Sequence, residues 1–172
     1  MITAAIAVTI LVALTILVHY EVLRLATVLI PEERHVRPRG RVVLAVFACF
    51  AAHTIEVWLF ALAYYLFVDV FALGSFGGAH DGTFVDYIYF SVVSYTSLGF
   101  GDVYPVDNVR LISGVEALVG LLMIGWSASF TYLAMARFWP MHGERVLPFV
   151  QAGKPRGRNE ARPGDERTPP VR

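Results

Sequence analysis

Residues 83–102 read TFVDYIYFSVVSYTSLGFGD and carry the most informative pattern in the chain. Thr83 and Asp86 have the spacing of a helix capping box, in which polar side chains satisfy free backbone N–H groups at the start of a helix. The apolar and aromatic residues that follow predict a helix over residues 84–95, which would be about 18 Å long. Because such a helix is too short to cross a bilayer, it indicates a re-entrant segment that other parts of the protein must cover.

The glycine-containing turn after this helix predicts a row of carbonyl oxygens. Gly99 and Gly101 tolerate positive φ, and alternation of such conformations turns successive carbonyls toward one axis. Four copies around an axis would form oxygen rings that replace the hydration shell of an ion, and the Ser97 hydroxyl would add a further ring. The negative end of the preceding helix favours cations. Although a G-x-G pattern alone is typical of ordinary turns, its position between a short helix and a spanning helix favours an ion site.

Three long apolar runs make up most of the remaining chain. They cover residues 1–30, 42–73 and 109–139, and each exceeds the about 20 residues that a helix needs to cross a bilayer. A cleaved signal peptide is the alternative for the first run, but no basic residue precedes its apolar core. The sequence therefore predicts an all-α membrane protein with three transmembrane helices and a re-entrant helix. The composition agrees, since 16% of residues are charged against about 25% in soluble domains.

The distribution of charge predicts how the chain crosses the membrane. Basic residues cluster in the loop 31–41 and again from Arg137 onward, so both segments should be cytoplasmic. Residues 74–108 and the N-terminus should then be external. The protein itself is expected in the inner or plasma membrane. Residues 140–172 are rich in proline, glycine and charge, which predicts a disordered cytoplasmic tail. Residues 42–109 contain no Lys or Arg, but they carry Glu56, Asp69, Asp81, Asp86, Asp102 and Asp107.

Several function classes are disfavoured by composition. The formal net charge is zero, which offers no basic field for nucleic acid. The single cysteine, Cys49, provides neither a disulfide framework nor a multi-thiolate zinc site. No nucleophile–base pair, phosphate loop or zincin motif is evident, so we expect no enzymatic activity and no cofactor apart from a permeant ion.

Residues 42–139 resemble the pore domain of the potassium channel family, in the small bacterial form with two pore-forming helices. The most specific part is TSLGFGD at residues 96–102, which is similar to the family's T-T-V-G-Y-G-D filter, and Tyr104-Pro105 and Arg110 also fit. The resemblance implies a homotetramer in a lipid bilayer that conducts K⁺ down its gradient. It assigns the filter to Thr96, Ser97, Leu98, Gly99, Phe100, Gly101 and Asp102, with K⁺ held by residues 97–101.

The chain departs from the family pattern at several positions. Phe100 replaces the usual tyrosine and Ser97 the usual threonine, while Tyr89 and Phe90 stand where the family often has a tryptophan pair. Tyr89 keeps a donor for Asp102. Because Phe100 lacks the hydroxyl of the usual tyrosine, we expect a filter that is less braced and that gates more readily. Gly120 and Gly125 lie where family members place inner-helix glycines that permit bending. The helix over residues 1–30 lies outside the two-helix pattern and is interpreted as peripheral to the pore.

Ionisable residues within the membrane are functional candidates by default, and three stand out: His53, Glu56 and Glu116. Depth along the predicted helices places Glu56 level with Trp126–Ser127 and His53 level with Ser129. The indole N–H of Trp126 is a suitable donor for the carboxylate. Glu116 is level with the short helix, where the candidate partners are Ser91, Ser94 and Tyr95.

These residues have a structural and a functional interpretation. Interhelical hydrogen bonds in membranes average about 0.6 kcal/mol and would tie helices together. Alternatively, His53 is a pH sensor, because histidine titrates near neutrality. His53 and Glu56 are also spaced as two metal ligands one helical turn apart, although two ligands fall short of the usual four.

Two rival functions use the same scaffold: a weakly selective cation channel and a non-conducting membrane scaffold protein. The gating stimulus is left open, since the chain has no arginine-repeat helix of the voltage-sensor type.

Overall fold

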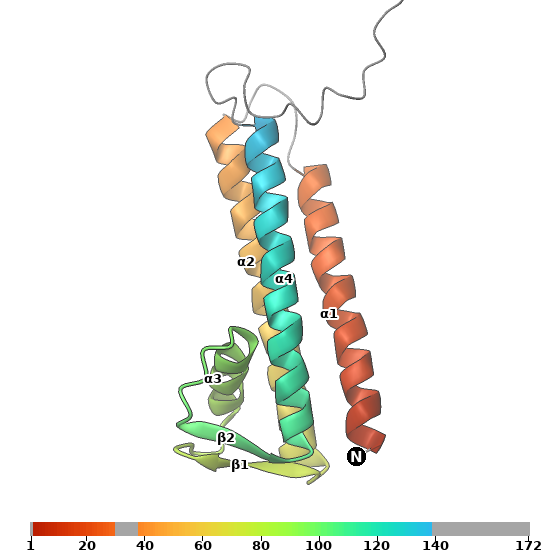
Figure 1. Cartoon of the computed structure of the whole chain (residues 1–172), viewed down its shortest axis with the longest axis vertical. Coiled ribbons are helices and arrows are strands. Elements are labelled where there is room, and N and C mark those ends of the chain that lie inside the picture. The colour runs from red at the N-terminus through yellow and green to blue at the C-terminus, as the bar shows by residue number, and fades with distance from the viewer. Residues whose placement is uncertain (1, 30–37, 139–172) are drawn as a thin grey trace, which may run out of the picture. The chain divides into compact units, whose positions relative to one another are not determined.

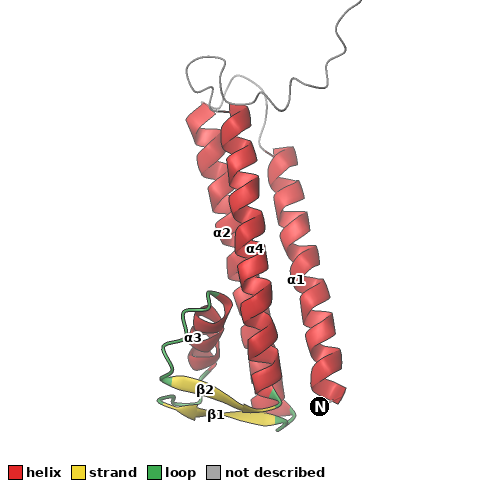
Figure 2. Ribbon diagram, viewed as in Figure 1, coloured by secondary structure: helices red, strands yellow, loops and turns green. Residues whose placement is uncertain are grey.

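A computed structural model describes residues 2–29 and 38–138 of the chain. Within these ranges three helices are long and apolar enough to cross a membrane, and the predicted all-α membrane fold is confirmed. The predicted tail 140–172 and most of the predicted loop 31–41 lie outside the described residues. In order, the elements are α1 (Ile2–Leu29), α2 (Pro38–Tyr65), the π-helical turn η1 (Leu66–Val70), β1 (Gly74–Gly78), α3 (Phe84–Tyr95), β2 (Val103–Asp107) and α4 (Val109–Phe138) (Figures 1 and 2).

The second helix starts earlier and ends earlier than the predicted outer helix 42–73. It begins at Pro38, inside the predicted basic loop 31–41, because proline is well suited to the first helical position, where its missing N–H needs no partner. At its other end the helix widens into η1, and the Phe71 N–H donates to the Leu66 carbonyl (2.9 Å). The spanning region of α2 and η1 therefore runs over Arg39–Val70.

The glycine content of residues 74–83 predicts a loop, but a two-stranded antiparallel ribbon includes part of this segment. β1 pairs with β2 so that Gly74 lies opposite Asp107 and Gly78 opposite Val103. Glycine has a low strand propensity, which is why the sequence indicated a loop. Here Gly78 adopts φ +101°, and a β-carbon would lie 2.0 Å from the Asp102 carbonyl oxygen. The ribbon therefore depends on glycine for the close approach of its two strands.

The short helix α3 and the ribbon lie at the end of the structure where α1 begins (Figure 1). They pack on α2 and α4, while α1 contacts the same two long helices. The buried residues of α1 recur every three to seven positions and form one stripe, as expected for a helix with a single protein-facing side. This stripe consists of Ala4, Leu11, Thr15, His19, Leu23 and Ala26.

An aromatic cluster attaches α3 to α2 and β1. The ring of Phe90 lies 4.6 Å from that of Phe76 and 5.2 Å from that of Tyr64, both in edge-on geometry. Edge-to-face aromatic pairs add about 0.5–1.5 kcal/mol beyond burial alone. Phe90 is therefore buried among aromatic rings, where no polar partner is needed.

Candidate ion-binding site

The first turn of α3 is held by the carboxylate of Asp86. Its Oδ2 accepts the backbone N–H groups of Thr83 (2.8 Å) and Asp81 (3.1 Å) and the hydroxyl of Thr83 (3.0 Å). The backbone hydrogen bond from Thr83 is the main cause of a lowered pKa of Asp86. The capping residues read from the sequence thus define where the short helix begins, at Phe84.

After Tyr95 the chain leaves α3 in a turn whose N–H groups point back at the helix. The N–H groups of Thr96, Ser97 and Leu98 donate to the carbonyls of Val92 (3.1 Å), Ser94 (2.9 Å) and Val93 (3.0 Å), respectively. These bonds satisfy carbonyls at the helix end that would otherwise be free. They also direct the N–H groups of the turn toward α3.

The backbone of the turn alternates in the sign of φ. Ser97, Gly99 and Gly101 have φ of +57°, +58° and +80°, whereas Leu98 and Phe100 are not in the positive region. Such alternation aims successive carbonyls in a common direction. Within the described ranges no hydrogen bond reaches the carbonyl oxygens of residues 97–101. The turn therefore presents a row of acceptors, which suits a cation that has shed water.

A hydrogen bond braces the outer end of this turn. The Tyr89 hydroxyl donates to Asp102 Oδ2 (2.6 Å), which is the contact expected from the sequence. This bond lowers the pKa of Asp102 and raises that of Tyr89. The Asp102 carbonyl also accepts the Ala79 N–H (2.8 Å), so the turn is attached to both α3 and the ribbon.

Gly120 and Gly125, the two candidate hinge residues of α4, have different surroundings. A β-carbon on Gly120 would come within 2.0 Å of the Tyr95 carbonyl oxygen, whereas one on Gly125 would meet nothing within 4 Å. Gly120 is thus a close contact between α4 and the end of α3. Bending of α4 at either glycine stays a prediction.

Glu116, on α4, accepts hydrogen bonds from α3 and α2. Ser91 Oγ donates to its Oε1 (2.5 Å), as the sequence indicated, and the Tyr64 hydroxyl donates to its Oε2. The other two candidates have different partners: Ser94 pairs with Ser113 (3.4 Å), and Tyr95 with a different carboxylate. Tyr64 was missed because depth estimates do not reveal which side of a helix faces the protein.

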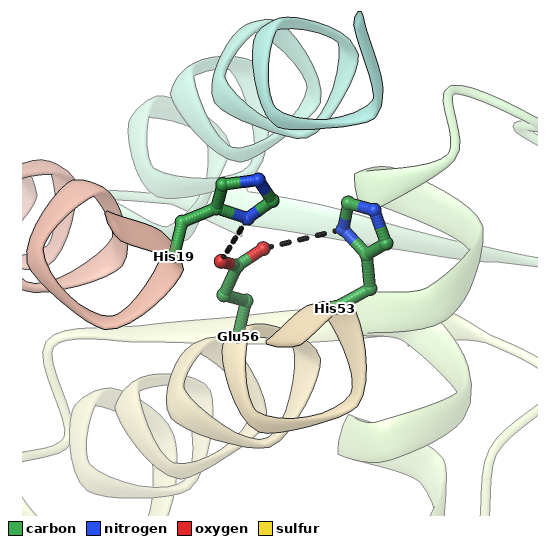
Figure 3. A group of neighbouring side chains, drawn as sticks. All are labelled: His19, His53 and Glu56. Carbon is green, nitrogen blue, oxygen red and sulfur yellow. Dashed lines mark hydrogen bonds and ion pairs between the residues drawn. The ribbon is translucent and has the colours of Figure 1, made fainter. Parts of the chain in front are cut away.

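Glu56 has partners that the sequence did not indicate (Figure 3). His19 Nδ1 lies 2.9 Å from its Oε1, and the Tyr95 hydroxyl donates to its Oε2. The expectation of a Trp126 donor is wrong, because the Trp126 ring instead packs against the His19 ring at 5.2 Å. Because the helix over residues 1–30 was interpreted as peripheral to the pore, His19 on α1 was not identified as a partner of Glu56.

His53 also differs from its expected pairing with Ser129. Its Nδ1 lies 2.8 Å from the Tyr95 hydroxyl and 3.4 Å from Glu56 Oε2. Ser129 instead donates to the Gly125 carbonyl on its own helix (3.0 Å), a bond that serine commonly makes inside helices. The end of α3 is therefore held by a carboxylate and an imidazole from α2, and His19 of α1 contacts that carboxylate.

Comparison with protein families matches residues 52–136 to the model described as "Ion channel". The match starts within α2 and extends over the ribbon, α3, the turn and most of α4, and it leaves out α1. Comparison with curated proteins finds no match, and comparison with solved structures finds none.

Proposed function

Because residues 52–136 are an ion channel domain, we propose that this protein is a potassium-selective channel that conducts K⁺ passively through a tetrameric pore. The observation that carries the proposal is the alternation of φ over residues 97–101, which lines up free carbonyl oxygens. Passive conduction requires no covalent chemistry, and no catalytic residue is proposed.

The K⁺ ligands in this proposal are backbone oxygens rather than charged side chains. The carbonyls of Ser97, Leu98, Gly99 and Phe100 coordinate K⁺, with Gly101 at the outer end and the Ser97 hydroxyl at the inner end. Carbonyl dipoles replace the hydration shell of K⁺ without binding it so tightly that it cannot leave. Thr96 and Asp102 are the first and last residues of the filter and fix its ends.

Association of four copies is supported by what one chain leaves uncovered. A single turn presents oxygens from one direction only, so enclosing an ion requires further copies around an axis. The side chains of Leu98 and Phe100 are 56% and 65% exposed in one chain, although they are large and apolar. Neighbouring subunits would bury both. A homotetramer therefore completes the ion site and covers this surface together.

The proposed orientation follows the charges. The basic residues 31–41 and those after Arg137 face the cytoplasm, and the N-terminus lies outside the cell membrane. The filter and the ribbon then face the external solution. Four acidic residues would surround the external mouth and attract cations: Asp81, Asp86, Asp102 and Asp107.

Ion flux through liposomes tests the proposal. The full-length protein should pass K⁺, and Gly99→Ala should abolish the flux, because alanine at φ +58° costs about 1–2 kcal/mol per site and distorts the filter. Gly82→Ala is the matched control: Gly82 also has positive φ (+73°) with free space around it, but it lies before α3. Its flux should equal that of the wild type.

Two results would contradict the proposal in different ways. Equal flux of Na⁺ and K⁺ would favour a weakly selective cation channel. Absence of flux from an intact, correctly inserted protein at any pH or voltage would favour a non-conducting scaffold. Wild-type flux in Gly99→Ala would show that the ion path lies elsewhere.

A further inference from the structure

We propose that His19, His53 and Glu56 bind a divalent transition metal ion of the zinc type at the junction of α1 and α2. One ligand atom from each of the three side chains lies within 4.8 Å of the other two. Figure 3 shows both imidazole rings turned toward the carboxylate from different helices. Residues His53 and Glu56 alone would be an incomplete pair, and α1 supplies the third ligand.

The distances fit a metal with small adjustments. Nδ1 of His19 lies 2.9 Å from Glu56 Oε1, and Nδ1 of His53 lies 3.4 Å from Oε2. Ligands about 2.1 Å from a tetrahedral zinc ion are roughly 3.4 Å from one another. The same nitrogen of each histidine faces the carboxylate, so no ring has to flip to receive the metal.

The donor set is one that zinc accepts. Two imidazoles and one carboxylate form zinc sites that keep a fourth position open, and borderline metals prefer this mixture over sites made only of oxygen. The Tyr95 hydroxyl lies next to that position, 2.8 Å from His53 Nδ1, and donates to Glu56. Tyr95 or a water molecule would therefore be the fourth ligand.

The surroundings of His19 hold its ring in the orientation that a ligand needs. Its second ring nitrogen, Nε2, lies 3.4 Å from Ser127 Oγ on α4, and its ring packs against Trp126. Partners of this kind fix the ring and the tautomer of metal-binding histidines. Thr15, one turn earlier on the same stripe of α1, is fully buried, and its hydroxyl has no partner among the described side chains. The Thr15 hydroxyl is therefore a hydrogen-bonding group near the site that no other described residue engages.

Burial of the Glu56 carboxylate favours binding of a cation. The side chains of His19 and Glu56 are both fully buried, and that of His53 is 21% exposed. A carboxylate within the membrane is costly unless it is paired. A divalent metal would compensate this charge.

The site would give the N-terminal helix a role. His19 lies outside the region matched by the ion channel family, whereas His53 and Glu56 lie inside it. A bound metal would therefore tie α1 to the channel domain. The metal would lie next to the side chain of Tyr95, which is the last residue of α3 and directly precedes the turn that begins at Thr96.

Metal binding to the purified full-length protein tests the proposal. After removal of metals with a chelator, Co²⁺ is added as a spectroscopic probe and then displaced with Zn²⁺. We expect one Co²⁺ per chain, a visible absorption band of a nitrogen- and oxygen-ligated site, and displacement by Zn²⁺. His19→Gln, His53→Gln and Glu56→Gln should each weaken binding at least tenfold, and Ser127→Ala should weaken it about tenfold or more.

The remaining histidines provide matched controls. His35→Gln, His80→Gln and His142→Gln should leave the stoichiometry and the absorption band unchanged. Wild-type binding by His19→Gln, or no Co²⁺ binding by the wild type, would overturn the proposal. If His19→Gln does not elute from size-exclusion chromatography as the wild type does, the test rests on His53→Gln. The partly exposed side chain of His53 can be replaced with less loss of packing. Unchanged affinity in an assembled His53→Gln would then also overturn it.

Discussion

The Cα of Gly120 lies so close to the carbonyl oxygen of Tyr95 that a β-carbon on residue 120 would come within 2.0 Å of it. This contact joins the middle of α4 to the last residue of α3. A displacement of α4 toward α3 at this point would therefore push on Tyr95, one residue before the turn that begins at Thr96. Proteins exploit glycine at such positions because only a missing side chain allows helices this close.

Gly120→Ala should destabilise the protein, because the clash is with backbone rather than with a flexible side chain. We expect a loss of about 1–3 kcal/mol, the usual range for overpacking. Thermal unfolding of the detergent-solubilised protein measures it. Gly114→Ala and Gly125→Ala are controls, since a β-carbon at either position meets nothing within 4 Å. Equal stability of the Gly120 and Gly114 variants would refute the contact.

Tyr89→Phe should make conduction less persistent. The variant loses the hydroxyl that donates to Asp102 (2.6 Å), so the outer end of the turn loses its bond to α3, although the Asp102 carbonyl still accepts the Ala79 N–H. Single-channel recordings should show open periods that are several-fold shorter. Tyr104→Phe removes a hydroxyl from an exposed tyrosine on β2 and should leave the open periods unchanged. Indistinguishable open periods in Tyr89→Phe and wild type would rule out a brace at this point.

Asp86 should make the stability of the protein depend on pH in the acid range. Its pKa is lowered in the folded state, so its contribution is complete above the unfolded-state pKa and is lost as pH falls through the folded pKa. Asp86→Asn should therefore be less stable than wild type at neutral pH, and the difference should vanish in acid. Chemical denaturation at a series of pH values measures the difference. A gap between the two proteins that is constant with pH would contradict the capping role.

Phe100→Tyr should brace the turn by restoring the hydroxyl that the family filter carries. We expect longer open periods and a higher ratio of K⁺ to Na⁺ permeability, both measured in planar bilayers. Phe71→Tyr, which adds a hydroxyl to an exposed phenylalanine at the end of η1, provides a comparison for non-specific effects. If Phe100→Tyr changes neither quantity, the absent hydroxyl has no bearing on gating.

Local patterns predicted the helices well. Thr83 and Asp86 marked the start of α3, and the three apolar runs marked the spanning helices, because capping chemistry and hydrophobic length depend on short segments of sequence. The glycines of the turn likewise indicated positive φ, and two of the three positive values fall on them.

Contacts between elements were predicted less well. Depth along a helix located Glu116 beside Ser91, but it paired Glu56 with Trp126, because it carries no information about rotation of the helix. The position of His19 depends on how α1 packs against α2 and α4, and apolar lipid-facing helices encode that packing weakly. The ribbon was missed for a different reason: its strand residues include three glycines, whose role emerges only from the close approach of Gly78 to Asp102.

The reversal potential of the full-length protein, measured with K⁺ on one side of a planar bilayer and Na⁺ on the other, tests the central claim most directly. If the carbonyls of residues 97–101 select K⁺, the current should reverse far from zero, on the side that K⁺ selectivity requires. A current that reverses near zero under the same gradient would contradict K⁺ selectivity.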